Sequence, residues 1–176
     1  MSSILSIVLL FLTMSSLSVV GFFSLVSGHV VKSPAPSKST SYVHYSSAWT
    51  SSDGSSVPVD IRVFSIGDHI LADYTTALII GNFYIPETSH PILIDSTHIY
   101  PVPGDPLDVE SYEKSQPDFL YPLVHVVGHV TIVSGDNDLF DNRKWFMARV
   151  SAYIRGEQKS TTIRYVFLPQ CDAANS

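Results

Sequence analysis

Aromatic and basic side chains alternate near the C-terminal end of the chain. Trp145, Arg149 and Tyr153 occupy alternate positions of one apolar segment that ends at Arg155, and Arg164 follows in the next segment. In an extended strand such positions share one face. Bases stack on rings while cations contact phosphates, so these five residues predict a platform for single-stranded nucleic acid. In the alternative interpretation, the rings cover one end of a barrel and the arginines solubilise an outer face.

Residues that could ligate metals lack a spacing that would hold an ion. His125 and His129 are four residues apart, which on a strand separates them by about 13 Å. The acidic turn 136–141 lacks the glycine and the closing glutamate of a calcium loop. We therefore expect no metal site and no cofactor.

The sequence also lacks a recognisable catalytic motif, such as a nucleophile elbow, a phosphate-binding loop or a zincin helix. A binding module without enzymatic activity is the expected class, and a hydrolase with dispersed catalytic groups is the weaker alternative.

The charge is divided unevenly along the 176 residues. The net charge is −6, from 10 basic and 16 acidic residues, which taken alone argues against a dedicated nucleic-acid binder. Between positions 143 and 164 there are six basic residues and one acid, a balance of +5, so the rest of the chain sums to −11. The basic segment is the one that carries the aromatic and basic pattern.

Most of the chain beyond residue 56 alternates apolar and polar side chains and is interrupted by Pro, Gly and Asp, as in antiparallel sheets. The expected strands cover 57–64, 76–85, 92–100, 123–133, 145–155 and 161–168. The second and third read as a hairpin, and Gly128 marks a bend in the fourth. The last three resemble the first half of an OB-fold barrel. The predicted fold is all-β, an OB-fold-like barrel or half-barrel of about six or seven antiparallel strands.

Residues 4–26 are uncharged and apolar, and about 23 residues of helix would span a bilayer core. We expect an N-terminal apolar helix outside the fold, either a signal peptide cleaved after Gly28 or a membrane anchor; a mis-assigned start is the third alternative. The protein would be secreted or membrane-held if this segment is functional, and intracellular otherwise. The expected organisation is 1–28 leader, 29–56 Ser/Pro-rich linker, 57–170 OB-like domain and 171–176 tail.

Several segments, among them GNFYIPE, PILIDSTHIYPVPGDP, VHVVGHVTIV and MARVSAYIRGEQKSTTIRYVF, resemble a family of uncharacterised proteins from mushroom-forming (basidiomycete) fungi. The resemblance covers about residues 57–168 and implies an OB-like fold, without an activity or a catalytic residue. Members usually lack an apolar leader and continue past the strand that matches 161–168. The resemblance therefore implies a barrel cut short, with 161–168 at an open edge.

Two functions follow from these expectations. The first is a binding module, with single-stranded nucleic acid as the candidate ligand. The second is a membrane-held or secreted protein-interaction domain that binds through a sheet edge. We expect strand 161–168 to complete its edge by pairing with residues 42–49. The alternatives are a homodimer through that edge and an edge that stays open and aggregation-prone.

Overall fold

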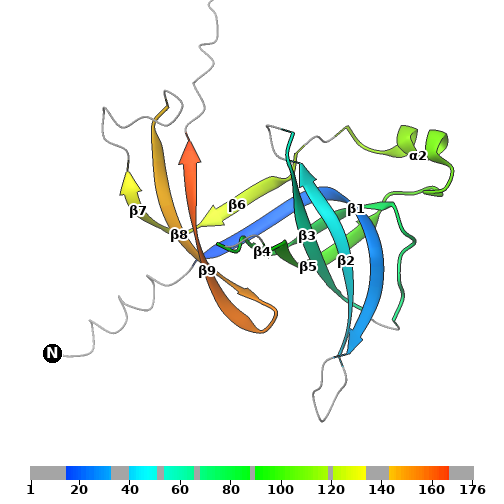
Figure 1. The fold of residues 1–176 in the computed structure, drawn as a ribbon, viewed down its shortest axis with the longest axis horizontal. Helices are drawn as coiled ribbons and strands as arrows, with labels where there is room; N and C mark the ends of the chain where they lie inside the picture. Colours follow the sequence, from blue (N-terminus) through cyan, green and yellow to red (C-terminus); the bar gives the residue numbers. More distant parts are fainter. Residues whose placement is uncertain are drawn as a thin grey trace, which may run out of the picture.

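A computed structural model describes residues 15–32, 40–50, 54–65, 68–87, 90–118, 121–133 and 143–166 (Figure 1). Over these ranges the chain is mostly β, with one short helix, α2 (Val109–Ser115). The strands are β1 (Ser16–Lys32), β2 (Ser41–Thr50), β3 (Ser56–Phe64), β4 (Thr75–Tyr84), β5 (Ile92–Pro101), β6 (Leu123–Val127), β7 (His129–Val133), β8 (Trp145–Ile154) and β9 (Glu157–Val166).

Five strands from the N-terminal part of the chain close into a barrel. Their order is β2-β3-β5-β4-β1, and β1 also pairs with β2, which completes the ring. Four of the pairs are antiparallel, whereas β3 and β5 run parallel. The expected all-antiparallel arrangement is therefore wrong for this pair. Strand β6 extends the sheet along the first residues of β1.

Strand β1 can join two partners because it bends in its middle. Its first part pairs with β4 as far as Leu25, and its second part pairs with β2 from Val26 onwards. At the bend Ser27 has a φ of 57°, and its amide donates to Oδ1 of Asp73 at 2.8 Å. A Cβ at Gly28 would lie 2.5 Å from Ile70, so a residue with a side chain does not fit there without movement.

The apolar helix expected over residues 4–26 is wrong for the part that the structure describes. From Ser16 the chain is strand β1, whose odd residues Leu17, Val19 and Phe23 are buried inside the barrel. The physical reason is that β4 and β6 hydrogen-bond to β1 on both sides, which satisfies its backbone without a helix. In the described ranges, no helix has the length and apolar character needed to cross a membrane. Residues 1–14 lie outside the described part.

The segment expected as a Ser/Pro-rich linker contains strand β2. Val43 and Tyr45 are buried in the barrel, whereas His44 between them and the other residues of the strand are half-buried or exposed, so a segment with several serines still forms a half-buried strand. The expected pairing of 42–49 with 161–168 is wrong. Residues 42–50 pair with β3, and 41–46 also pair with β1.

The strands expected at 57–64, 76–85, 92–100 and 145–155 are confirmed to within one residue at each end, whereas the strand expected at 161–168 begins earlier, at Glu157. Strands β4 and β5 form the predicted hairpin, and the chain breaks at Gly128 between β6 and β7. A Cβ at Gly128 would lie 2.9 Å from the carbonyl oxygen of Arg149, so the chain crosses β8 closely at this point. Strands β7, β8 and β9 then form a separate three-stranded sheet, so the expectation that the last three strands begin the barrel is wrong, because the barrel is formed by β1 to β5. Its edge strands within the described residues are β7 and β9.

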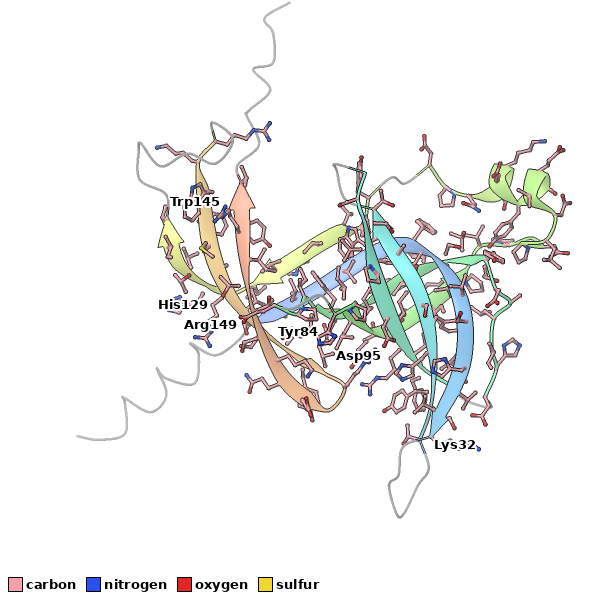
Figure 2. The ribbon with its side chains drawn as sticks, viewed as in Figure 1. Lys32, Tyr84, Asp95, His129, Trp145 and Arg149 are labelled. Carbon is pink, nitrogen blue, oxygen red and sulfur yellow. The ribbon has the colours of Figure 1, made fainter. Side chains whose placement is uncertain are left out.

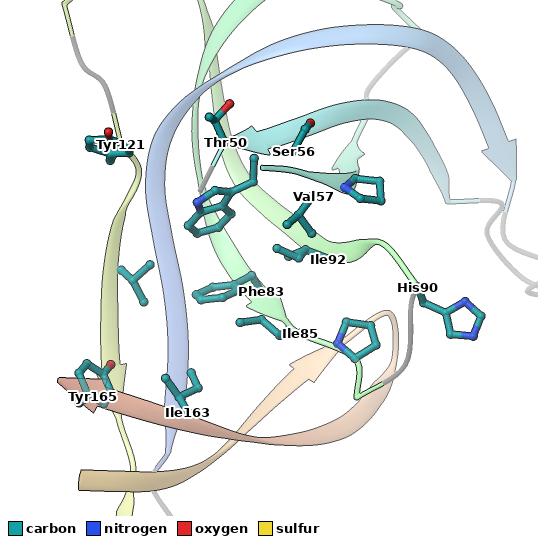
Figure 3. Close-up of a pocket in the computed structure, with 14 residues that line it drawn as sticks. Thr50, Ser56, Val57, Phe83, Ile85, His90, Ile92, Tyr121, Ile163 and Tyr165 are labelled. Carbon is teal, nitrogen blue, oxygen red and sulfur yellow. The ribbon is translucent and has the colours of Figure 1, made fainter. Parts of the chain in front are cut away.

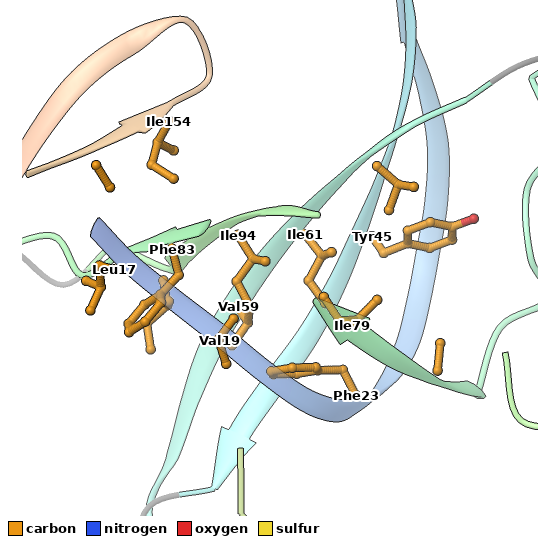
Figure 4. Packing of buried hydrophobic residues seen from close by; sticks show 14 of the residues in the cluster. Leu17, Val19, Phe23, Tyr45, Val59, Ile61, Ile79, Phe83, Ile94 and Ile154 are labelled. Carbon is orange, nitrogen blue, oxygen red and sulfur yellow. The ribbon is translucent and has the colours of Figure 1, made fainter. Parts of the chain in front are cut away.

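This three-stranded sheet packs on one end of the barrel (Figure 1). Ala148, Val150, Ala152 and Ile154 of β8 belong to the same buried cluster as the barrel core. Figure 4 shows Ile154 at the end of the cluster where Leu17 and Phe83 lie. The packing fixes the other face of β8 and β9 towards the outside.

Candidate nucleic-acid interface

Four of the five predicted site residues lie on one face of the β8–β9 hairpin. Trp145 pairs with Val166, Met147 with Arg164, Arg149 with Thr162 and Tyr153 with Gln158. Directly paired residues share a face, so Trp145, Arg149, Tyr153 and Arg164 are together on what we call the outer face of β8–β9. The inner face carries Phe146, Ala148, Val150, Ala152 and Ile154, as predicted.

Arg149 lies at the centre of the outer face (Figure 2). Its side chain is exposed, with His129 of β7 on one side and Thr162 of β9 on the other. At about 3.3 Å per residue, Trp145 and Tyr153 are each about 13 Å from it along the strand. A guanidinium in this position can contact a phosphate while a base contacts a neighbouring ring.

The two aromatic residues of the outer face differ in solvent exposure. Tyr153 is 68% exposed, so its ring is available for stacking. Trp145 is only 9% exposed, and the guanidinium carbon of Arg164 lies 4.9 Å from its ring centroid. Trp145 therefore supports Arg164 through a cation–π contact, a role that the sequence pattern did not indicate.

Arg155 does not belong to the outer face, although its position in the sequence predicted it there. The last ladder pair is Ile154 with Glu157, and the two residues between them have φ angles of 55° (Arg155) and 86° (Gly156). This is the geometry of a tight two-residue hairpin turn, in which the strand alternation ends. The side chain of Arg155 instead reaches Asp60 of β3 at 2.8 Å.

Arg155 completes a network of charged side chains on the barrel surface. Its backbone amide donates to Oδ2 of Asp95 at 2.7 Å, and Arg62 holds the same carboxylate through Nε at 2.9 Å and a terminal guanidinium nitrogen at 2.6 Å. Asp60 also contacts Nδ1 of His44 at 3.3 Å. From the sequence Asp60 and Asp95 had no assignable partners. The parallel β3–β5 pair places Arg62 directly beside Asp95, and no local pattern reveals that pair.

Burial lowers the pKa of His44 from its ordinary value, and the charges of Arg155 and His29 lower it further while Asp60 opposes them. The neutral imidazole can still donate from Nδ1 to the Asp60 carboxylate. His44 also stacks on His29, with ring centroids 5.7 Å apart. This network ties the barrel to the hairpin and leaves the outer face to the other four residues.

The outer face is positively charged. In the described residues of β7, β8 and β9 the one carboxylate is Glu157, which pairs with Lys159 at 2.8 Å. A second carboxylate approaches from the β4–β5 connection, where Glu87 lines a hollow of about 370 Å³ together with Arg149 and Thr162. Glu87 thus lowers the positive potential near Arg149.

The described residues contain no cluster of three or more His, Cys, Asp or Glu side chains that could hold a metal ion. His125 and His129 lie on different strands, β6 and β7, on either side of the break at Gly128. The acidic turn 136–141 lies outside the described ranges.

No protein-family model matches the chain, and a search of curated proteins finds no match. Among solved structures, the chain is similar to a deletion mutant of the single-stranded DNA binding protein from Thermus aquaticus. The TM-score is 0.43 at 9% sequence identity, and the match covers 86% of this chain and 74% of that chain. This similarity is too weak to carry a function to the present chain.

Proposed function

We propose that the protein is a non-enzymatic binding module for single-stranded nucleic acid, built on an OB-type barrel, and that the outer face of β8–β9 holds the strand. The observation that carries the proposal is the exposed Arg149 at the centre of a sheet face whose other residues include Arg164 and the exposed ring of Tyr153. The five-stranded ring with its parallel β3–β5 pair supports the scaffold.

The chemistry of this face suits a flexible single strand better than a duplex. Tyr153 offers an aromatic surface on which any base can stack, and such stacking contributes about 1–3 kcal/mol per base. Arg149 and Arg164 can follow the phosphates along the same face of the sheet. A duplex keeps its bases stacked inside and would leave the ring of Tyr153 unused.

A second function is favoured by the apolar surface of β6 and β7. Leu123, Val127, Ile132 and Val133 are exposed large apolar residues on these two short strands. Exposed apolar strands at sheet edges pair readily with another chain. We propose protein interaction through this surface, including a homodimer, as the alternative to nucleic-acid binding.

Fluorescence anisotropy with a labelled mixed-sequence single-stranded DNA tests the first proposal, with a duplex of the same sequence as the comparison. Arg149→Ala should weaken binding and reduce the slope of log affinity against log salt by about 0.7. Glu87→Gln should strengthen binding, because it removes the carboxylate beside Arg149. Lys114→Ala on α2 removes an exposed positive charge at a distance from β7–β9 and serves as the matched control (Figure 1).

If Arg149→Ala and Lys114→Ala lost the same affinity for single-stranded DNA, the binding would be a general attraction to positive charge. That result would overturn the proposed site. Absence of saturable binding at low salt would overturn the function itself. Light scattering on the same protein decides the alternative, since a dimer that dissociates in Val127→Arg or Ile132→Arg would support the apolar surface as an interface.

A further inference from the structure

A cavity lies between the barrel and the inner side of the C-terminal sheet, away from the outer face of β8–β9 (Figure 3). Its volume is about 740 Å³, within the range of about 300–1,000 Å³ that small-molecule sites occupy. We propose that this cavity is a second binding site, which takes a neutral, largely apolar aromatic small molecule.

The walls of the cavity come from elements far apart in the sequence. Trp49, Val57 and Phe83 line it from the end of the barrel, and Tyr121, Val124, Ile163 and Tyr165 line it from β9 and the region of β6. Figure 3 shows the labelled rings of Phe83 and Tyr165 on different strands around the same space. The cavity is therefore a product of packing the sheet on the barrel.

Aromatic rings on both walls are held in place by their neighbours. The ring of Trp49 lies 6.1 Å from that of Phe23 and 5.8 Å from that of Phe83. On the opposite wall, Tyr165 stacks on Phe146 with centroids 4.9 Å apart. Rings fixed in this way offer preformed surfaces for an edge-to-face or offset contact with a planar ligand.

The lack of charged residues in the described lining disfavours the binding of ions. None of the fourteen described lining residues is Asp, Glu, Lys or Arg, so these residues offer no permanently charged partner for a phosphate or a carboxylate. Transfer of an unpaired ion into such a site is strongly unfavourable. Polar groups at Thr50, Ser56, His90 and Tyr121 can orient a ligand by hydrogen bonds. These features favour a neutral aromatic molecule over a nucleotide.

Two fluorescent probes of similar shape and different charge test the proposal. N-phenyl-1-naphthylamine is neutral, and 8-anilinonaphthalene-1-sulfonate adds a negative charge to the same ring system. The chain has two tryptophans, so Trp145→Phe leaves Trp49 as the single tryptophan reporter in the cavity wall. We expect saturable binding of the neutral probe with quenching of Trp49, and at least about tenfold weaker binding of the anion.

Two substitutions of exposed valines form a matched pair. Val124 lines the cavity and is 42% exposed, whereas Val31 on β1 is 41% exposed and does not line it. Val124→Arg should reduce the affinity for the neutral probe by about tenfold or more, while Val31→Arg should leave it unchanged.

Equal probe binding in the two variants would overturn the site, because it would place the probe on the general apolar surface. Equal affinity of the two probes for the protein with native Val124 would overturn the selectivity for neutral ligands. That comparison stands even if Val124→Arg does not fold, which circular dichroism would detect.

Discussion

The guanidinium of Arg155 lies 2.8 Å from Oδ1 of Asp60, which joins the β8–β9 turn to strand β3 of the barrel across 95 positions of sequence. The backbone amide of the same turn residue reaches Asp95 of β5. Because one residue contacts carboxylates on two neighbouring barrel strands, it sets the position of the hairpin whose other face carries the proposed interface.

Arg155→Ala should destabilise the protein by about 1–2 kcal/mol, because it removes a partly buried charge-assisted contact from Asp60. Arg155→Gly removes the same contact but relieves the positive φ of 55°, so it should cost about 1 kcal/mol less. Urea unfolding measures both. A double-mutant cycle with Asp60→Asn isolates the pair, and a coupling energy near zero would show that the contact adds no stability.

The fold that positions these groups could be predicted only in part from the sequence. Strands β3, β8 and β9 alternate, and β4 and β5 contain short apolar runs bounded by turn residues, so their local patterns suffice to place them. Strand β1 is different, because Val20 and Phe22 make its outward positions apolar as well. An uncharged run that is apolar on both faces has no visible period of two, and by length alone it matches a membrane helix.

The candidate site could likewise be predicted only in part from the sequence. The positions of Trp145, Arg149, Tyr153 and Arg164 on one face follow from local alternation and could be predicted. The position of Arg155 depends on where the hairpin turns, which breaks the alternation at that residue. The contacts of Arg155 with Asp60 and Asp95 depend on the parallel β3–β5 pair and on the packing of the hairpin turn against it, and no local sequence pattern reveals either.

Acidification should weaken the barrel through His44. Burial lowers the pKa of His44 in the folded protein below the ordinary value of 6.5. The unfolded chain therefore binds the proton more readily, so the stabilising contribution of the neutral ring is present above about pH 6.5 and is lost as the pH falls through the lowered folded pKa. In urea unfolding between about pH 7.5 and about pH 5, His44→Gln should lose less stability than the unaltered protein.

The carboxylates change the free energy of unfolding of both proteins with pH. The effect of His44 is therefore the difference in this free energy between His44→Gln and the unaltered protein at each pH. His98→Gln, at an exposed position, controls for the removal of a histidine. Parallel profiles for His44→Gln and the unaltered protein would contradict the role of His44.

Tyr112 of α2 should anchor the helix to the barrel. Its hydroxyl accepts a hydrogen bond from the buried Thr76 amide at 2.7 Å and donates to the Thr76 carbonyl at 3.4 Å. The carbonyl also accepts from Val102, so Tyr112→Phe leaves chiefly the amide without its partner. We expect a loss of about 1–3 kcal/mol in the free energy of unfolding and faster hydrogen exchange at Thr76. Tyr74→Phe, at an exposed position, should change neither quantity.

The unequal access of the two rings on the outer face predicts which one a base would contact. Tyr153 is 68% exposed, whereas Trp145 is 9% exposed and lies against the guanidinium of Arg164. Tyr153→Ala should therefore weaken binding of single-stranded DNA by about 5- to 150-fold, the equivalent of about 1–3 kcal/mol of stacking. Tyr153→Phe keeps the ring and should retain most of the affinity.

Trp145→Phe should have a small effect on affinity, because a phenyl ring still supports Arg164 by a weaker cation–π contact. Anisotropy titrations of the three variants at one salt concentration measure these differences, with circular dichroism to confirm that each variant folds. If Trp145→Phe lost as much affinity as Tyr153→Ala while Tyr153→Phe lost none, bases would have to stack on both rings. Arg164 would then have to leave Trp145 when the strand binds, and the outer face would change its conformation on binding.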